Sequence, residues 1–290
     1  MLTPPESPFY ARLRTVSHHV TWWMGQRFTR AIPMVFVLGF PKSGTTWVSQ
    51  ITADYLQLPF PKFSLLPIGF PAVVHGHERV TRRYPRGVYA MRDGRDALTS
   101  MFFYVLRRIP EGQRRKLSRR QRRIFPGFTS HADKQGNFNR FVEAQMKRPH
   151  IGINWGDHVL SYYEAANPGM VLLKYEDLRL DGPRTFASAM RDLTGRDPDM
   201  DRIQVTLDRF SFDKQSGRKA GQEDAKSFLR KGQVGDWRNH FTVEAAEMFA
   251  EHCGDALIRA GYEPDAAWLD QFRRERQAAS PAATPISAAP

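Results

Sequence analysis

Cysteine is nearly absent from this chain, since Cys253 is the only one among 290 residues. A lone cysteine cannot form an internal disulfide, so the fold must be held by its core, and the chain fits a reducing compartment. No apolar run approaches the roughly 20 residues that span a bilayer. The N-terminus also lacks the basic, apolar and small-residue order of a secretory signal. We therefore expect a soluble, cytoplasmic protein.

Acidic residues are also scarce, particularly near the N-terminus. The chain has 43 Lys and Arg against 30 Asp and Glu, a net charge of +13, and no acidic residue between Glu6 and Asp54. Such an excess predicts a polyanionic partner. Helix-turn-helix, zinc-ligand and RNP-like patterns are all missing, which disfavours nucleic acid as that partner. A small ligand with several anionic groups is the better hypothesis.

One segment has the pattern of an anion-binding turn. Residues 39–47, Gly-Phe-Pro-Lys-Ser-Gly-Thr-Thr-Trp, directly follow the apolar run Met34–Leu38. A strand, a glycine-containing turn and a helix start bring backbone N–H groups and the positive helix end to one point. A Walker A motif would place the lysine after the second glycine, whereas Lys42 precedes Gly44. The turn therefore predicts a P-loop-like phosphate site, but not an ordinary ATP or GTP site.

Three apolar runs predict buried parallel strands, each followed by a helical pattern. The strands are expected over Met34–Leu38, Gly87–Met91 and Met170–Lys174. Helices are expected over Thr45–Gln57, Arg95–Val105, Trp155–Ala166, Arg184–Leu193 and Val243–Ala260. We predict a single α/β domain over residues 9–277, with a central parallel sheet flanked by helices. The ends, 1–8 and 278–290, cannot bury an apolar face and are expected to be disordered.

A further helix is expected near the N-terminus. Leu13, Val16, Val20 and Trp23 fall at helical spacing, with basic residues outside this stripe. In one interpretation the stripe packs on the domain or on a partner subunit. In the other it contacts an anionic membrane.

Three later segments extend the pattern of the anion-binding turn. They are Arg92–Ser100, Lys174–Leu178 and Phe228–Trp237. Together with the turn, and in this order, they resemble the cytosolic-type sulfotransferases, whose donor is 3′-phosphoadenosine 5′-phosphosulfate (PAPS). The resemblance implies a PAPS-dependent sulfotransferase that needs no metal and acts on an acceptor hydroxyl, or less often an amine, of a small molecule or lipid. A nucleotide kinase and a catalytically silent nucleotide-binding or nucleic-acid-binding protein are the alternatives.

The resemblance also assigns the donor site. It implies that Lys42 is catalytic and holds the bridging and leaving oxygens. The residues expected to bind PAPS are Lys42, Ser43, Gly44, Thr45 and Thr46 at the 5′-phosphosulfate, Trp47, Tyr175 and Phe212 at the adenine, and Arg92, Ser100, Arg230, Lys231 and Gly232 at the 3′-phosphate. Arg95 and Asp96 are interpreted as capping or structural pairs.

The general base should be a histidine between the phosphate turn and Arg92, because an acceptor hydroxyl loses its proton during transfer. His75 and His77 are the candidates. In the family the base ends a Lys-Thr-His or Lys-Ser-His triplet, which aligns His77 with the base and puts His75 in place of the lysine. We favour His77. A two-histidine metal site is disfavoured, because no cysteine or further histidine lies nearby.

The resemblance implies two further features on the acceptor side. The walls of the acceptor pocket are expected at Phe60–Phe70, Phe102–Tyr104 and Phe125–Phe128. Residues 107–135, with nine Arg and Lys between 107 and 123, are expected to form a mobile acceptor-side loop. This loop is interpreted as a lid, a contact for an acidic surface or a merely solvated segment.

A short motif predicts a small homodimer. Residues 238–247 resemble the family's dimer segment, with Thr242 and Val243 at a two-fold axis and Arg238 paired with Glu247 between chains. The alternative is that Thr242 simply caps the last predicted helix.

Overall fold

Four parallel strands form the central sheet, in the order β2-β1-β3-β4. They are β1 (Val35–Leu38), β2 (Val73–Gly76), β3 (Gly87–Met91) and β4 (Met170–Lys174). The computed structural model describes residues 7–62, 64–109, 118–219, 221–224, 227 and 230–279. The three predicted strands are confirmed. The sequence pattern did not predict β2, because the apolar run before His75 is only the three residues Ala72, Val73 and Val74.

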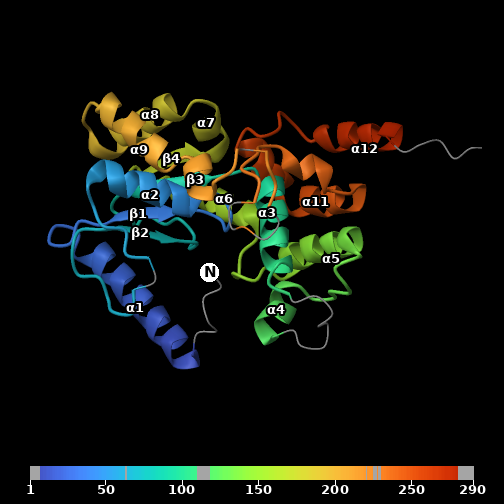
Figure 1. Cartoon of the computed structure of the whole chain (residues 1–290), viewed down its shortest axis with the longest axis horizontal. Helices are drawn as coiled ribbons and strands as arrows, with labels where there is room; N and C mark the ends of the chain where they lie inside the picture. The colour runs from blue at the N-terminus through green and yellow to red at the C-terminus, as the bar shows by residue number, and fades with distance from the viewer. Residues whose placement is uncertain are drawn as a thin grey trace, which may run out of the picture.

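The sheet is buried on both faces because alternate side chains of each strand enter different helical layers. Val35 and Val37 pack with α2 (Thr45–Leu56), α8 (Gly182–Thr194) and α9 (Met200–Arg209). Phe36 and Leu38 face the other side, where the larger cluster includes residues of α3, α5, α6, α11 and α12. Those helices span Gly94–Leu106, Lys134–Lys147, Trp155–Ala165, Val243–Arg259 and Trp268–Ala279 respectively. Figure 1 shows α2, α8 and α9 above the sheet and α1 (Pro8–Arg27) below it.

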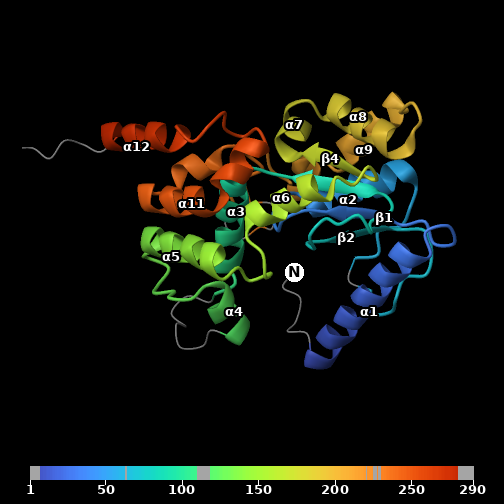
Figure 2. The ribbon, with the colours of Figure 1, turned by 180° about the vertical axis from the view of Figure 1, so that it is seen from behind.

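The five predicted helices are confirmed, and the sequence missed several others. The missed elements are α4 (Arg119–Ile124), α5, α7 (Tyr175–Leu180), α9, α10 (Phe212–Ser216), the 3₁₀ helix η2 (Asp236–Asn239) and α12. In both ribbon views α5, α11 and α12 stack beside the sheet (Figures 1 and 2). Helix α12 is joined to this stack by buried Trp268 and Phe272. Together these elements make a single α/β domain.

The N-terminal helix is present, but its buried face differs from the predicted stripe. Ser7 caps α1 and Pro8 begins it, so the predicted disorder over 1–8 is wrong for these two residues. The buried face contains Ser17, Thr21 and Trp22. Because Thr21 accepts a hydrogen bond from Ile68 N and Trp22 packs on Phe36, this face is fixed by tertiary contacts rather than by apolarity. Of the predicted stripe, Val16 and Trp23 are exposed, whereas Leu13 and Val20 are half-buried.

Two other expected irregular segments contain helix. The expected loop over 107–135 includes α4, whose Ser118 and Gln121 form a capping box, and the start of α5. Residues 110–117, which carry Arg114, Arg115 and Lys116, lie outside the described residues. At the other end α12 continues to Ala279, so the predicted disorder over 278–290 is wrong for its first two residues. Within the described ranges, no helix is both long and apolar enough to cross a bilayer.

Candidate active site

The turn between β1 and α2 has the geometry of an anion cradle. Lys42 has φ 71° and Gly44, the N-cap of α2, has φ 85°, so the backbone turns sharply at both positions. A Cβ on Gly39 would lie 2.3 Å from the carbonyl oxygen of Ala90, and one on Gly44 would lie 2.9 Å from the Tyr175 ring. Both glycines are therefore required for space, and Gly44 also for its conformation. The free N–H groups of α2 begin at this point.

Lys42 is held in a cationic environment at the turn. Burial, followed by the nearby charges of Arg92, Arg107 and Arg108, lowers the pKa of Lys42 to about 7. The ammonium also lies 4.6 Å from the centre of the Tyr104 ring. Neighbouring cations disfavour the charged form of Lys42, so an anion bound here would be needed to hold it protonated.

Arg92 joins the turn to two other segments far away in the sequence. Its guanidinium donates to the carbonyl oxygens of Lys42 and Gln233, each at 3.3 Å. It also stacks 4.5 Å from the centre of the Tyr175 ring, which itself meets Trp47 edge-on at 5.8 Å. The structure thus brings together the β1–α2 turn, the end of β3, the start of α7 and the 230–233 loop.

The 230–233 loop is anchored through one acidic residue. Asp236 is paired with both Arg230 and Lys231, the latter at 2.6 Å. Burial opposes ionisation of Asp236, but hydrogen bonds from His240, Lys231 and Arg230 hold its pKa far below the ordinary range. Gly232 has φ 62°, and a Cβ there would lie 2.6 Å from the Phe212 ring, so this loop packs flat against that ring. Phe228 and Leu229 of the same motif lie outside the described residues.

Three buried polar atoms in the donor segments lack hydrogen-bond partners among the described residues. They are Ser43 Oγ, Trp47 Nε1 and Arg92 Nε. Buried polar groups are nearly always satisfied, so a cluster of such atoms fits a bound polar ligand. The residues present therefore fit a phosphorylated nucleotide.

The structure also bears on the remaining donor-motif residues. Arg95 pairs with Asp93 at 2.7 Å and with Glu263 at 2.6 Å. Asp96 accepts hydrogen bonds from Gly235 N and Trp237 N, so it holds η2 against α3. The structural interpretation of Arg95 and Asp96 is confirmed. Ser100 lies half-buried on α3, the helix that also carries Arg95 and Asp96.

His77 lies where β2 ends beside the phosphate turn. Its Nδ1 lies 2.7 Å from the carbonyl oxygen of Gly39. Because a carbonyl only accepts, Nδ1 carries the proton and Nε2 keeps its lone pair. Burial lowers the pKa of His77 despite the opposing hydrogen bond to Gly39, and the nearby charges of Lys42 and Lys62 lower it further. His77 is therefore neutral at pH 7.

His75 and His158 lie close to His77, but their own contacts differ from those of His77. The His75 ring meets that of Phe60 edge-on at 5.4 Å, and burial, followed by the neighbouring His77, lowers the pKa of His75 to about 3. His158 is fully buried, with Nδ1 2.8 Å from the Tyr89 hydroxyl and Nε2 3.3 Å from the His77 carbonyl oxygen. Burial lowers the pKa of His158 to about 4. Of the three, His77 is the one oriented by the phosphate turn.

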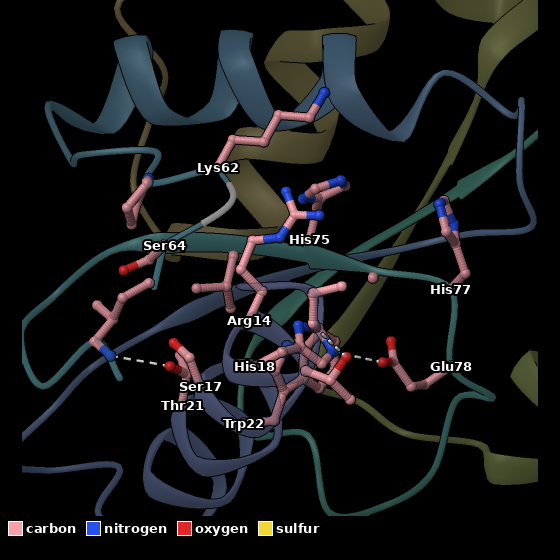
Figure 3. A pocket seen from close by; sticks show the side chains of 16 residues that line it. Arg14, Ser17, His18, Thr21, Trp22, Lys62, Ser64, His75, His77 and Glu78 are labelled. Carbon is pink, nitrogen blue, oxygen red and sulfur yellow. Dashed lines mark hydrogen bonds and ion pairs between the residues drawn. The ribbon is translucent and has the colours of Figure 1, made fainter. Parts of the chain in front are cut away.

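A cavity of about 440 Å³ adjoins His75 and His77. Figure 3 shows its walls, which come from α1, the 61–68 segment and the end of β2. Of the segments expected to wall the acceptor pocket, only 60–70 lines this cavity. Phe102, Phe125 and Phe128 are buried in the core, whereas the centre of the Tyr104 ring lies 4.6 Å from the Lys42 ammonium. The polar face of α1 supplies the other wall of the cavity.

Sequence reasoning missed two cations of this cavity, Arg14 and Lys62. Lys62 donates to the Thr46 hydroxyl at 3.1 Å, so it joins this cavity to the first turn of α2. No motif marks either residue, and the only sequence signal for Arg14 is that it lies off the apolar stripe. Both are found only because α1 and the 61–68 segment fold over β2. Metal-binding clusters of three or more His, Cys, Asp or Glu do not occur among the described residues.

The fold and this set of residues define a nucleotide-dependent transferase. The family described as "Sulfotransferase domain" matches residues 72–261, more than half of the chain. This match begins after the phosphate turn, so the turn is independent support. The chain therefore belongs to the sulfotransferase family, which confirms the prediction of a PAPS-dependent sulfotransferase and disfavours the kinase alternative.

Similar proteins agree with this assignment. The protein named Amine sulfotransferase from Oryctolagus cuniculus is 24% identical over 254 residues, covering 74% of this chain and 77% of its own. Cytosolic sulfotransferase 1 from Danio rerio is 26% identical over 281 residues, covering 81% and 87%. The crystal structure of mouse sulfotransferase SULT7A1 complexed with 3′-phosphoadenosine 5′-phosphate (PAP) has the same fold, with a TM-score of 0.59. The two chains are 20% identical, and the match covers 90% of this chain and 95% of that one.

Proposed function

We propose that this enzyme transfers the sulfuryl group of PAPS to an acceptor hydroxyl, with His77 as general base and Lys42 at the leaving oxygen. Gly44, Thr45 and Thr46 would hold the 5′-phosphate at the start of α2. Lys42 would neutralise charge as the sulfur–oxygen bond to the departing phosphate breaks. The observation that carries the proposal is the hydrogen bond of 2.7 Å from His77 Nδ1 to Gly39, which leaves Nε2 as an acceptor beside the phosphate turn.

The other donor contacts follow from the same placement. Arg92, Arg230 and Lys231 would hold the 3′-phosphate, because Arg92 contacts the loop that carries the other two. The aromatic rings of Trp47, Tyr175 and Phe212 would enclose the adenine. Arg230 and Lys231 would exchange part of their pairing with Asp236 for the phosphate, as charge-assisted bonds to phosphate are strong.

The test separates the base from the donor site. His77→Gln should lower turnover with a phenol such as 2-naphthol by roughly 10²–10⁴, the usual contribution of a positioned base. Affinity for PAP, the donor product, should remain, because His77 does not contact the nucleotide in this proposal. His75→Gln is the matched control, since it removes a neighbouring imidazole without removing the one held by Gly39. If His75→Gln lost the larger share of turnover, the base would be His75.

We further propose that the outward stripe of α1 contacts an anionic membrane, so that a cytoplasmic enzyme could reach a lipid acceptor. Val16 and Trp23 of the predicted stripe are 58% and 59% exposed. Phe9, which lies seven residues before Val16, is 68% exposed. Leu13 and Val20 of the stripe are half-buried, so only part of it packs on the domain. Arg12 and Arg27 are exposed on the same helix, and no acidic residue occurs between Glu6 and Asp54. Exposed apolar side chains bordered by arginine suit an anionic bilayer.

A homodimer through 238–247 remains a proposal. Thr242 does cap α11, accepting from Ala245 N at 3.0 Å. Arg238 and Glu247 are paired within the chain, with Glu275 at 3.1 Å and Arg273 at 2.6 Å. Both partners are exposed residues of α12, so these pairs could exchange for pairs between chains at small cost.

A further inference from the structure

We propose that the acceptor carries an oxyanion group, a carboxylate or phosphate, in addition to the hydroxyl that is sulfated. This inference rests on the proposed function, because it treats the cavity beside His77 as the acceptor site. The cavity of about 440 Å³ has the size of a small-molecule site. Its side chains determine what kind of molecule it can take.

The cavity is richer in cations than a site for a neutral aromatic compound needs. Its cations are Arg14 and Lys62, and the imidazoles of His18, His75 and His77 add further polar groups to the lining. Figure 3 shows Arg14 extending across the cavity toward His75, while Lys62 extends toward α2. Arg14 is half-buried, so its charge is only partly screened by water. An arginine in this position can bind a carboxylate or phosphate through two parallel hydrogen bonds.

Glu78 is the single carboxylate among the sixteen described residues that line the cavity. Glu78 is paired with His18 at 2.7 Å, on the His77 side of the cavity (Figure 3). Its hydrogen-bonding capacity is therefore already partly used. The remaining polar groups are the hydroxyls of Thr15, Ser17, Thr21 and Ser64. Apolar area is supplied by Trp22, Ile68 and Val74.

This arrangement also solves an electrostatic problem of the reaction. The donor presents a sulfate next to a phosphate, which would repel an acceptor that is itself negative. Lys62 lies between the acceptor cavity and the donor site. It lines the cavity, and its ammonium donates to the hydroxyl of Thr46 in the donor site. Arg14 would bind the oxyanion of the acceptor, and Lys62 would reduce its repulsion from the donor.

The chemical step is an ordinary sulfuryl transfer. The acceptor oxygen forms a bond to sulfur as the bond from sulfur to the 5′-phosphate oxygen breaks. The hydroxyl proton passes to His77 Nε2 and then to solvent. The products are the sulfate monoester, PAP and one proton, and the oxyanion of the acceptor is unchanged.

The experiment compares an acid with its own ester. With PAPS as donor, kcat/KM is measured for 4-hydroxyphenylacetate and its methyl ester, and then for both with Arg14→Gln, Arg14→Lys and Arg12→Gln. We expect the wild type to prefer the acid about tenfold or more, as for a charge-assisted contact. Arg14→Gln should bring the ratio toward one, and Arg14→Lys should restore part of it. Arg12→Gln, a loss of the same charge at an exposed site two residues earlier, should keep the ratio.

Binding measurements keep the inference testable if turnover is slow. Calorimetry of 4-hydroxyphenylacetate with the PAP-loaded protein should show the same dependence on Arg14. A wild-type enzyme that favours the ester, or a preference for the acid that survives in Arg14→Gln, would overturn the inference. Failure of the wild type to bind PAP would instead refute the proposed function. Lysophosphatidylglycerol is tested beside 4-hydroxyphenylacetate. The better substrate of the two shows whether the oxyanion belongs to a lipid headgroup or to a soluble compound.

Discussion

Lys42 is the residue at which the charge of the donor site is concentrated. Its pKa of about 7 results from burial and from neighbouring arginines, so at neutral pH about half of the molecules lack this proton. A bound phosphosulfate would favour the charged form. Binding of the nucleotide should therefore be coupled to proton uptake.

The first prediction at this scale concerns that proton. PAP binding at pH 8 should take up roughly 0.9 proton, because a group of pKa 7 is then mostly neutral and becomes protonated on binding. Calorimetry in HEPES and in Tris, which differ in ionisation enthalpy, measures the uptake. Lys42→Arg, which is always charged, should abolish it, and His77→Gln should retain it. Equal binding enthalpies in the two buffers would contradict the prediction.

Residue-scale constraints also explain which glycines matter here. Gly39, Gly44 and Gly232 lie where a side chain would collide with backbone or with an aromatic ring. Two of them, Gly44 and Gly232, also have positive φ. These positions bring backbone N–H groups close to the donor site, which a larger residue would prevent.

At the scale of elements, α1 has two different faces. One face, which includes Arg14, Ser17 and Trp22, lines the cavity. The other carries the exposed side chains of Val16 and Trp23. With the proposed membrane contact, this helix would connect a bilayer to the proposed acceptor site beneath it.

We expect the wild type to sediment with phosphatidylcholine vesicles only when they contain phosphatidylglycerol, and less so at high salt. Trp23→Glu should weaken this binding about tenfold or more, because it removes a large buried apolar side chain from the membrane and adds a like charge. Leu180→Glu is the control, since Leu180 is an apolar residue on α7 that is 89% exposed, more than Trp23. Unchanged binding of Trp23→Glu would refute membrane contact. Loss of a dimer in that variant would assign the stripe to a second copy of the chain.

The α11 segment permits a test of assembly. Glu247→Lys would place like charges across the proposed two-fold axis and should dissociate the dimer without unfolding the monomer. Light scattering with circular dichroism measures both. Arg273→Gln is the control, because it breaks the same pair within the chain without adding a charge at the axis. A wild type that is monomeric at tens of micromolar would exclude this dimer.

At the scale of the whole molecule, the buried histidines link stability to pH. The pKa of His158 is lowered to about 4 and that of His75 to about 3. Below pH 6.5 these two imidazoles bind protons in the unfolded chain but stay neutral in the folded protein. Each histidine therefore contributes stability that is complete above pH 6.5 and is lost as the pH falls toward the folded-state value.

The unfolding free energy should accordingly decrease by about 1.4 kcal/mol per pH unit for each of these histidines between pH 6.5 and 4. Urea titrations at several pH values measure the slope. His158→Gln keeps a polar side chain but removes the titration, so its slope should be shallower by about that amount even if its stability at pH 7 is lower. Parallel slopes for the two proteins would show that His158 is protonated in the folded state.

The sequence by itself determined the donor half of this protein. Strand, turn and helix start are local patterns, and the glycines, Lys42 and Arg92 belong to contiguous motifs, so three strands, five helices and the family could be predicted. Tertiary structure decided the acceptor half. Whether α1 buries its apolar stripe or its polar face depends on contacts with Phe36 and Ile68, which are distant in sequence. Phe102, Phe125 and Phe128, expected around the acceptor, are buried in the core instead, because apolar composition does not show which surface a side chain will cover.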